Sequence, residues 1–216
     1  MRKFSPVALF SVATFCQAAT ITFGNSPQPN ECNVMLNTGA TGTVVSGTLQ
    51  AGSGCTPSPT VMFASTTGQT LIEPATGQAR IETAGGVAVN SMTVSLAGSL
   101  TYQDLIFNLA VTGNTTQGGT ANISVLSPTS ASLGTSSFAL GNGNNFVTIV
   151  AGSGEQIIST AVTVSGGAGF ASFQQPRISG PFTPTGGSVP EPATYALLGI
   201  GLLCFAVLQR LRAKRS

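Results

Sequence analysis

The side chains that could do chemistry in this sequence are few, and histidine is not among them. Because histidine is the commonest general base and the commonest metal ligand, serine, cysteine and metal hydrolases in their usual forms are excluded. Two carboxylates flanking a glycosidic bond could still hydrolyse it by acid–base catalysis. The acids available for this are Glu73, Glu82, Asp104 and Glu155. No two of them can be placed opposite each other from the sequence. We therefore expect these four acids to be surface groups or ion-pair partners of Arg80 and Arg177, and we predict no catalytic residue.

Residues that could bind a ligand are almost as sparse. Glycan sites often use exposed aromatic platforms. The chain has no tryptophan, and outside the C-terminal stretch Tyr102 is its single tyrosine. Tyr102 close to Asp104 could mark a polar contact, although a tyrosine packed on a neighbouring strand is the commoner arrangement. A calcium cage needs several converging carboxylates, so we predict no metal and no cofactor. A carbohydrate-binding module remains an alternative hypothesis.

Charge argues against nucleic acid as a partner. The formal net charge of +2 comes from basic residues at the two ends, whereas acids outnumber arginines over residues 19–188. A protein that binds nucleic acid needs a basic face to neutralise phosphates. The glycine-rich runs at 141–143 and 152–154 lack the Lys-Ser or Lys-Thr of a phosphate loop. We interpret both runs as hairpin turns.

The elements that must position these residues are β-strands. Apolar residues alternate with polar ones over residues 92–96, 105–111, 123–125, 146–150 and 158–164, and residues 43–49 suggest an early strand pair. Glycine-rich turn signals lie between them, including Gly118-Gly119 and Gly166-Gly167. The pattern predicts an antiparallel β-sandwich, jelly-roll-like, over residues 19–180. Its core phenylalanines are expected to be Phe63, Phe107, Phe138, Phe146, Phe170 and Phe173.

The N-terminal end resembles a secretory signal. Arg2 and Lys3 precede an apolar run, and small residues follow at Cys16 and Ala18. We expect a signal peptide at residues 1–18, cleaved by signal peptidase after Ala18. An acylated Cys16 is the alternative, but a lipoprotein would have small residues where Thr14 and Phe15 stand.

The C-terminal end has three parts after a proline- and glycine-rich linker at residues 181–188. The first is a short motif of Val189, Pro190, Glu191 and Pro192. Residues 193–208 are apolar and would span about 24 Å as a helix against a membrane core of about 30 Å, which flanking polar and cationic groups can extend. The last part is the basic tail of Arg210, Arg212, Lys214 and Arg215. This order predicts a single membrane span with a cytoplasmic C-terminus. A buried core helix, the alternative, would show polar residues at helical spacing.

The arrangement of residues 189–215 resembles the PEP-CTERM sorting signal of Gram-negative bacteria that produce exopolysaccharide. The resemblance implies export, transient anchoring in the inner membrane, and cleavage near the motif by an exosortase, a membrane-embedded cysteine transpeptidase. Pro190, Glu191 and Pro192 would then be residues that another enzyme recognises. Residues 77–82, 104–108 and 175–180 are more weakly similar to segments of β-sandwich ectodomains in exported PEP-CTERM proteins.

Two cysteines remain between the terminal signals, Cys32 and Cys55. In an oxidising periplasm they would most simply form one disulfide. A catalytic cysteine, the alternative, would need a histidine nearby as its base, and the chain contains none. We therefore expect an exported protein of the cell surface or extracellular matrix, with a non-enzymatic structural or adhesive role and polysaccharide as a possible partner. A carbohydrate-binding module is the second hypothesis, and a two-carboxylate glycoside hydrolase is the third.

Overall fold

The computed structural model describes residues 18–51, 55, 59–77, 79–112, 118–180 and 182. The described chain is all-β and antiparallel, as expected, apart from one short 3-10 helix, η1 (Ala97–Ser99). Among these described residues, no helix is long and apolar enough to cross a membrane. The predicted signal peptide up to residue 17, the linker beyond Phe182, the helix at 193–208 and the basic tail lie outside the described residues.

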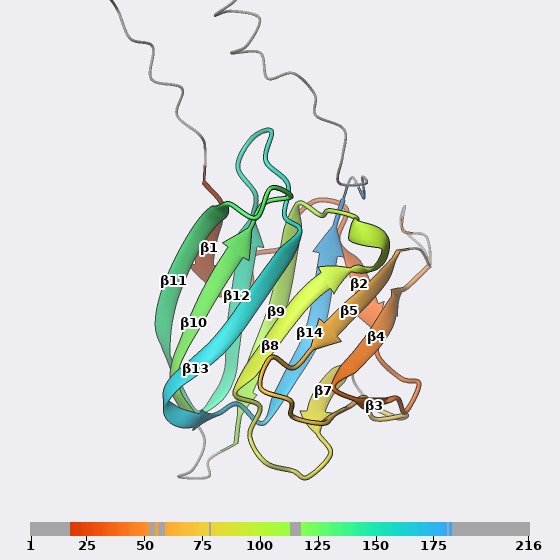
Figure 1. Cartoon of the computed structure of the whole chain (residues 1–216), viewed down its shortest axis with the longest axis vertical. Coiled ribbons are helices and arrows are strands. Elements are labelled where there is room, and N and C mark those ends of the chain that lie inside the picture. The colour runs from red at the N-terminus through yellow and green to blue at the C-terminus, as the bar shows by residue number, and fades with distance from the viewer. Residues whose placement is uncertain are drawn as a thin grey trace, which may run out of the picture. The chain divides into compact units, whose positions relative to one another are not determined.

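The strands form two layers that face each other (Figure 1). The back layer contains, in spatial order, β1 (Thr20–Phe23), β12 (Gly143–Val150), β9 (Asp104–Val111), β14 (Ser172–Ser179) and β2 (Cys32–Met35). The front layer contains β4 (Val44–Leu49), β5 (Thr60–Ala64), β8 (Ser91–Leu96), β13 (Ser159–Gly169), β10 (Gly118–Leu126) and β11 (Ser132–Leu140). Three short strands complete the fold: β3 (Thr41–Gly42), β6 (Leu71–Ile72) and β7 (Arg80–Thr83).

The two layers are parts of one sheet, which differs from the two separate sheets expected of a sandwich. Strand β2 pairs with β14 on one side and with β4 on the other, so the ladder continues from layer to layer. At the far ends of the path, β1 and β11 come close. The Ala19 amide donates to the Leu133 carbonyl at 2.8 Å, and the rings of Phe23 and Phe138 lie 4.1 Å apart.

The core lies between the layers, as alternation predicts. Leu105, Phe107 and Leu109 of β9 are fully buried and belong to the core. Phe173 of β14 stacks on Phe107 at 4.7 Å and meets Phe63 of the front layer edge-on at 5.7 Å. Of the expected core phenylalanines, Phe63, Phe107, Phe170 and Phe173 are fully buried, while Phe138 and Phe146 are half-buried.

The glycine-rich runs at 141–143 and 152–154 are not hairpin turns, so that prediction was wrong. The first joins β11 to β12 and the second joins β12 to β13, and neither pair of strands is hydrogen-bonded together. Both runs cross from one layer to the other. The prediction assumed that strands adjacent in sequence are adjacent in the sheet.

Gly118-Gly119 and Gly166-Gly167 also lie in strands instead of turns, at a bulge between β10 and β13. A Cβ on Gly167 would lie 2.2 Å from the carbonyl oxygen of Gly118. Glycine is therefore required here because the two backbones approach too closely for a side chain.

Candidate functional site

A strap of polar residues crosses the outer face of the back layer. We define it as residues 24–31, the connection between β1 and β2. Ile106 shows that this face is covered: it is fully buried, yet it alternates with Leu105 and Phe107 and so points away from the core. Its ladder neighbours, Thr148 on β12 and Arg177 on β14, both bond to the strap. The strap therefore passes over Ile106.

One end of the strap is fixed through Thr148. The Thr148 hydroxyl donates to the Gly24 carbonyl at 2.8 Å and accepts from the Ser26 amide at 3.1 Å. The Gly24 amide in turn donates to the Phe146 carbonyl at 2.8 Å. These bonds turn the chain off the end of β1 and onto the sheet face.

Arg177 fixes the other end of the strap through Glu31 and also binds Asn25 near the first end. Its Nη1 lies 2.7 Å from Glu31 Oε2, and its Nη2 donates to the side-chain oxygen of Asn25. The Gln28 amide donates to the other Glu31 oxygen. The side chains of Glu31 and Arg177 are only 10% and 20% exposed, so this ion pair is largely withdrawn from solvent. The predicted disulfide, Cys32–Cys55, follows directly and is confirmed.

Four strand residues form a single row across the back layer beside the strap. Thr20 pairs with Val150, Val150 with Asp104, and Asp104 with Ser179. Thr20 is the first residue of β1 and Ser179 is the last of β14. The described chain therefore enters and leaves the fold at the same end of the sheet, with Asp104 between the two points.

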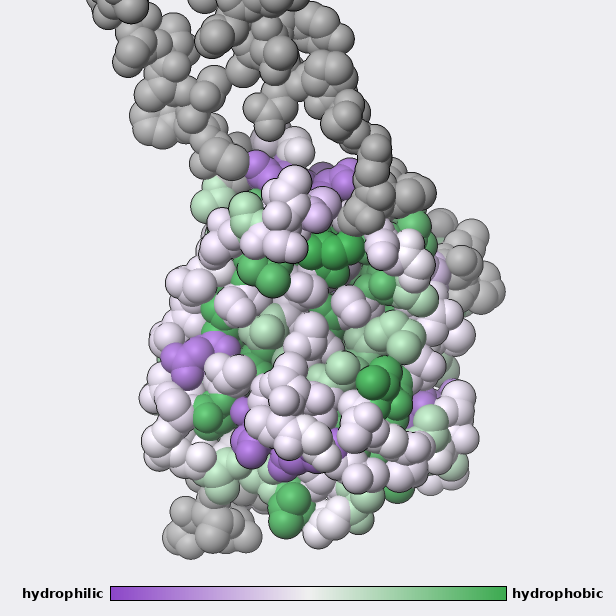
Figure 2. Space-filling model, in the orientation of Figure 1, coloured by the Kyte–Doolittle hydropathy of each residue, from purple (hydrophilic) through white to green (hydrophobic). Residues whose placement is uncertain are grey.

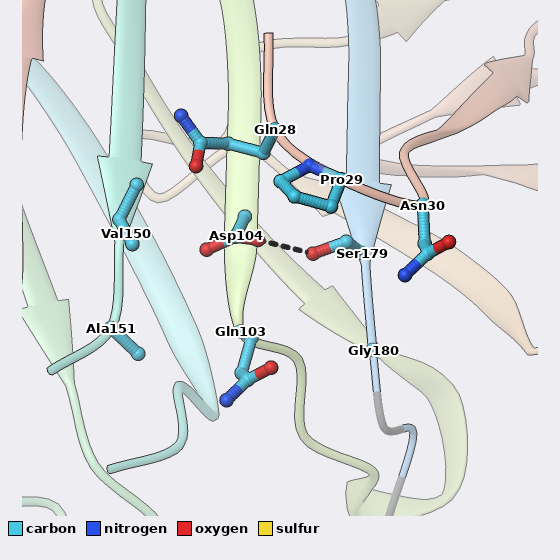
Figure 3. A pocket seen from close by; sticks show the side chains of 9 residues that line it. All are labelled: Gln28, Pro29, Asn30, Gln103, Asp104, Val150, Ala151, Ser179 and Gly180. Atoms are coloured by element: carbon cyan, nitrogen blue, oxygen red, sulfur yellow. Dashed lines mark hydrogen bonds between the residues drawn. The ribbon is translucent and has the colours of Figure 1, made fainter. Parts of the chain in front are cut away.

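A pocket of about 270 Å³ lies at this row, under the strap (Figure 3). Gln28 and Pro29 of the strap lie beside Asp104 and Ser179, over β9 and β14, and Gln103 extends from the chain just before β9. The remaining lining residues are Asn30, Val150, Ala151 and Gly180. The lining thus combines amide groups, which both donate and accept hydrogen bonds, with one carboxyl group.

Asp104 is the ionisable group of this pocket. It is 9% exposed, and its Oδ2 accepts a hydrogen bond from the Ser179 hydroxyl. Burial raises the pKa of Asp104, the Ser179 hydrogen bond lowers it, and the nearby charge of Glu31 raises it further. The net direction is upward, so the carboxyl holds its proton to higher pH than an exposed aspartate.

The other acids proposed from sequence do not join Asp104 in the pocket. Glu82 forms an ion pair with Arg80, with Oε1 2.7 Å from Nε but without hydrogen-bond geometry. Glu73 is fully buried elsewhere and accepts a 2.5 Å hydrogen bond from Thr38, while its Oε1 has no hydrogen-bond partner in the described chain. Glu155 lies in the turn after Gly152. No group of three metal-ligating side chains occurs among the described residues.

Tyr102 faces the interior and takes no part in the pocket. It is fully buried, and its hydroxyl donates to the Thr160 hydroxyl at 2.9 Å. Burial raises the pKa of this phenol, and the Thr160 hydrogen bond opposes the rise. Packing on a neighbouring strand, the commoner arrangement named above, is what the structure contains.

Sequence reasoning found Asp104 but missed Glu31, Gln28 and Ser179. Glu31 and Arg177 lie 146 positions apart, so nothing in the sequence pairs them. The available signal was weak: a polar, proline-containing run between two short strands.

Comparison with known proteins identifies the C-terminal end. The family model of the PEP-CTERM protein-sorting motif matches residues 188–211, which confirms that the C-terminal end carries this signal. The match ends before Arg212, and all of it lies outside the described residues. Neither curated proteins nor solved structures gave a match to the chain.

Proposed function

We propose that this protein is exported, sorted by an exosortase, and delivered to the cell surface or the extracellular polysaccharide matrix, where it has a non-enzymatic structural or adhesive role. The sorting motif at residues 188–211 carries this proposal. Signal peptidase removes residues 1–18, and the helix at 193–208 anchors the chain in the inner membrane until an exosortase cleaves near the motif. The ectodomain of residues 19–180, which we describe as a jelly-roll-like sandwich, belongs to the part that remains.

The arrangement of the described domain supports delivery on a C-terminal tether. Thr20 and Ser179 lie in one row at the same end of the sheet. A domain held from that end leaves its opposite end accessible.

The arrangement of acids supports a non-enzymatic role over the two-carboxylate hydrolase. Asp104 lines the pocket, whereas Glu31, the acid whose charge raises the pKa of Asp104, is bound to Arg177. A glycosidase needs a second carboxylate free to act as base or nucleophile. The described pocket supplies one carboxyl group among amides.

Cell fractionation with and without the exosortase tests this proposal. We expect a shorter protein at the surface or in the medium when the enzyme is present, and a full-length protein in the inner membrane when it is absent. Substitution of Glu191→Ala in the motif should reproduce the second pattern in wild-type cells. A full-length protein retained in the inner membrane under all conditions would contradict the proposal.

The pocket favours a carbohydrate-binding module as the second candidate function. At about 270 Å³ it suits one small polar ring, and its amides and carboxyl group offer the donors and acceptors that sugar hydroxyls need. A glycan array with the purified full-length protein tests this, with Asp104→Asn as the variant. Binding that weakens in the variant supports the module, and a blank array at high micromolar glycan refutes it.

A further inference from the structure

The outer face of the front layer carries no charge. Not one Asp, Glu, Lys or Arg occurs in β4, β5, β8, β10, β11 or β13, in a chain whose content of these residues is already low at 6%. The side chains that point outward from these six strands are mainly serine and threonine. We call this surface the hydroxyl face.

The hydroxyl face is open and continuous. One row runs through the ladder from Thr135 to Ser124, Ala161 and Thr93, and each of these residues is exposed or half-buried. Neighbouring strands lie about 4.8 Å apart, so six strands present rows of hydroxyls over about 25 Å. Figure 2 shows this side mostly in white and pale colours, with several green hydrophobic patches and a few small purple ones.

The two outer faces of the domain therefore differ. The back face holds the strap, the Glu31–Arg177 ion pair, Asp104 and the Arg80–Glu82 pair. None of the described charged side chains belongs to a strand of the hydroxyl face. This separation places an uncharged surface opposite a charged one within the same domain.

An uncharged partner suits the hydroxyl face best. Removing water from charged groups is costly unless they find opposite charges, and this face avoids that cost. It offers no cation to an anionic polymer and no anion to a basic one. Serine and threonine hydroxyls rotate and both donate and accept, so they can match the hydroxyl groups of a polymer in many registers.

We propose that the hydroxyl face is an adhesion surface for uncharged polysaccharide, which lies across the strands and is held by many weak contacts. Individual hydrogen bonds to sugar hydroxyls compete with water and contribute little. Repetition along a polymer raises the overall affinity without a deep pocket or aromatic platform. This inference deepens the proposed adhesive role and rests on delivery outside the cell.

Sedimentation of the full-length protein in detergent with insoluble particles tests the inference. Cellulose serves as the uncharged polysaccharide and cross-linked alginate as the anionic one. We expect retention on cellulose and little on alginate. The paired substitutions Thr93→Lys and Thr163→Lys put two charges at the centre of the face and should lower retention on cellulose roughly tenfold or more.

A second charged double variant and a control variant complete this test. Thr93→Glu with Thr163→Glu should weaken retention as much, because either sign of charge must be desolvated. Val87→Lys adds a charge on a loop where Val87 is 61% exposed and should leave retention unchanged. Far-ultraviolet circular dichroism shows whether each variant is folded, and these outward positions tolerate a larger side chain.

Three results would overturn the inference: undiminished retention of both paired variants, preference of the wild type for alginate, or loss of cellulose binding in Asp104→Asn with normal binding of the face variants. Failure of the proposed function would give a different result, namely the absence of processing in the fractionation experiment. The paired variants retain residues 188–211, so their processing should be normal.

Discussion

Asp104 couples its charge to the stability of the fold. Its pKa is raised above the ordinary 3.8 by burial and by Glu31. The native state therefore binds a proton more tightly than the unfolded state, and this contribution to stability is complete below pH 3.8. It is lost as the pH rises through the higher pKa of the folded protein. Ionised Asp104 consequently costs stability at neutral pH.

We predict that Asp104→Asn removes this pH dependence. The free energy of unfolding of the variant should rise relative to that of wild type as the pH increases from about 4 to about 7, because only the wild type loses stability as Asp104 ionises. Urea unfolding at a series of pH values measures the difference. Ser179→Ala removes the hydrogen bond that lowers the pKa, so it should extend the wild-type decline to higher pH. Parallel curves for Asp104→Asn and wild type would contradict this assignment.

The contribution of the Tyr102–Thr160 hydrogen bond to stability depends on both partners. Tyr102→Phe leaves the buried Thr160 hydroxyl without this donor and should lower the free energy of unfolding by about 1–2 kcal/mol. Adding Thr160→Val removes the unsatisfied hydroxyl, so the double variant should lose less than the sum of the single losses. Additive losses in thermal unfolding would show that the two hydroxyls are not coupled.

The strap is the element that makes the pocket, and Arg177 holds it. Arg177→Gln leaves Glu31 buried without its cation and weakens the bond to Asn25. We expect a loss of about 1–3 kcal/mol in unfolding free energy and faster hydrogen exchange at the Ser26 and Gln28 amides. Mass spectrometry of peptides covering residues 24–31 measures the exchange.

Arg80→Gln is the matched control for the strap prediction. The side chains of Arg80 and Glu82 are 34% and 38% exposed, so solvent screens their ion pair. Its loss should cost about 0–1 kcal/mol and leave exchange in the strap unchanged. Equal effects of the two arginine substitutions would mean that the strap does not depend on Arg177.

Individual strands were predictable to the extent that one face of each is buried. The alternation in 92–96 and 105–111 corresponds to β8 and β9 because their inward residues meet the core. The strap could not be found this way, since its bonds run to Thr148 and Arg177, far away in sequence. The connections at 141–143 and 152–154 were misassigned for the same reason: glycine indicates a turn but does not say which strands pair.

For the whole molecule, β2 is the short joint on which both layers depend. It pairs through two residues with β14 and through two with β4, and the Cys32–Cys55 disulfide fixes its first residue. We predict that Cys55→Ser lowers the unfolding free energy by about 3 kcal/mol, because the bridge closes a loop with a sequence separation of 23. Urea unfolding with and without reductant measures it. Reductant should lower the stability of the wild type to that of the variant and leave the variant unaffected.

The candidate pocket shows how far sequence could lead at this scale. Asp104 was named because carboxylates are rare in the chain, but a row through Thr20, Val150 and Ser179 exists only once the strands are ordered. The hydroxyl face is similar. Each strand contains its serines and threonines, yet their gathering on one side follows from six strands sharing a layer.

The row that joins Thr20 to Ser179 also makes the domain suited to circular permutation. Three strand spacings separate the two residues, about 15 Å, which a linker of a few residues can bridge. New termini opened at the exposed turn around Gly85 would lie at the opposite end of the sheet, since β7 pairs with β14 near Phe173. A sorting signal attached to these new termini would tether the same domain from its opposite end. Comparing the two tethered forms would separate the contribution of the fold to adhesion from the contribution of its orientation.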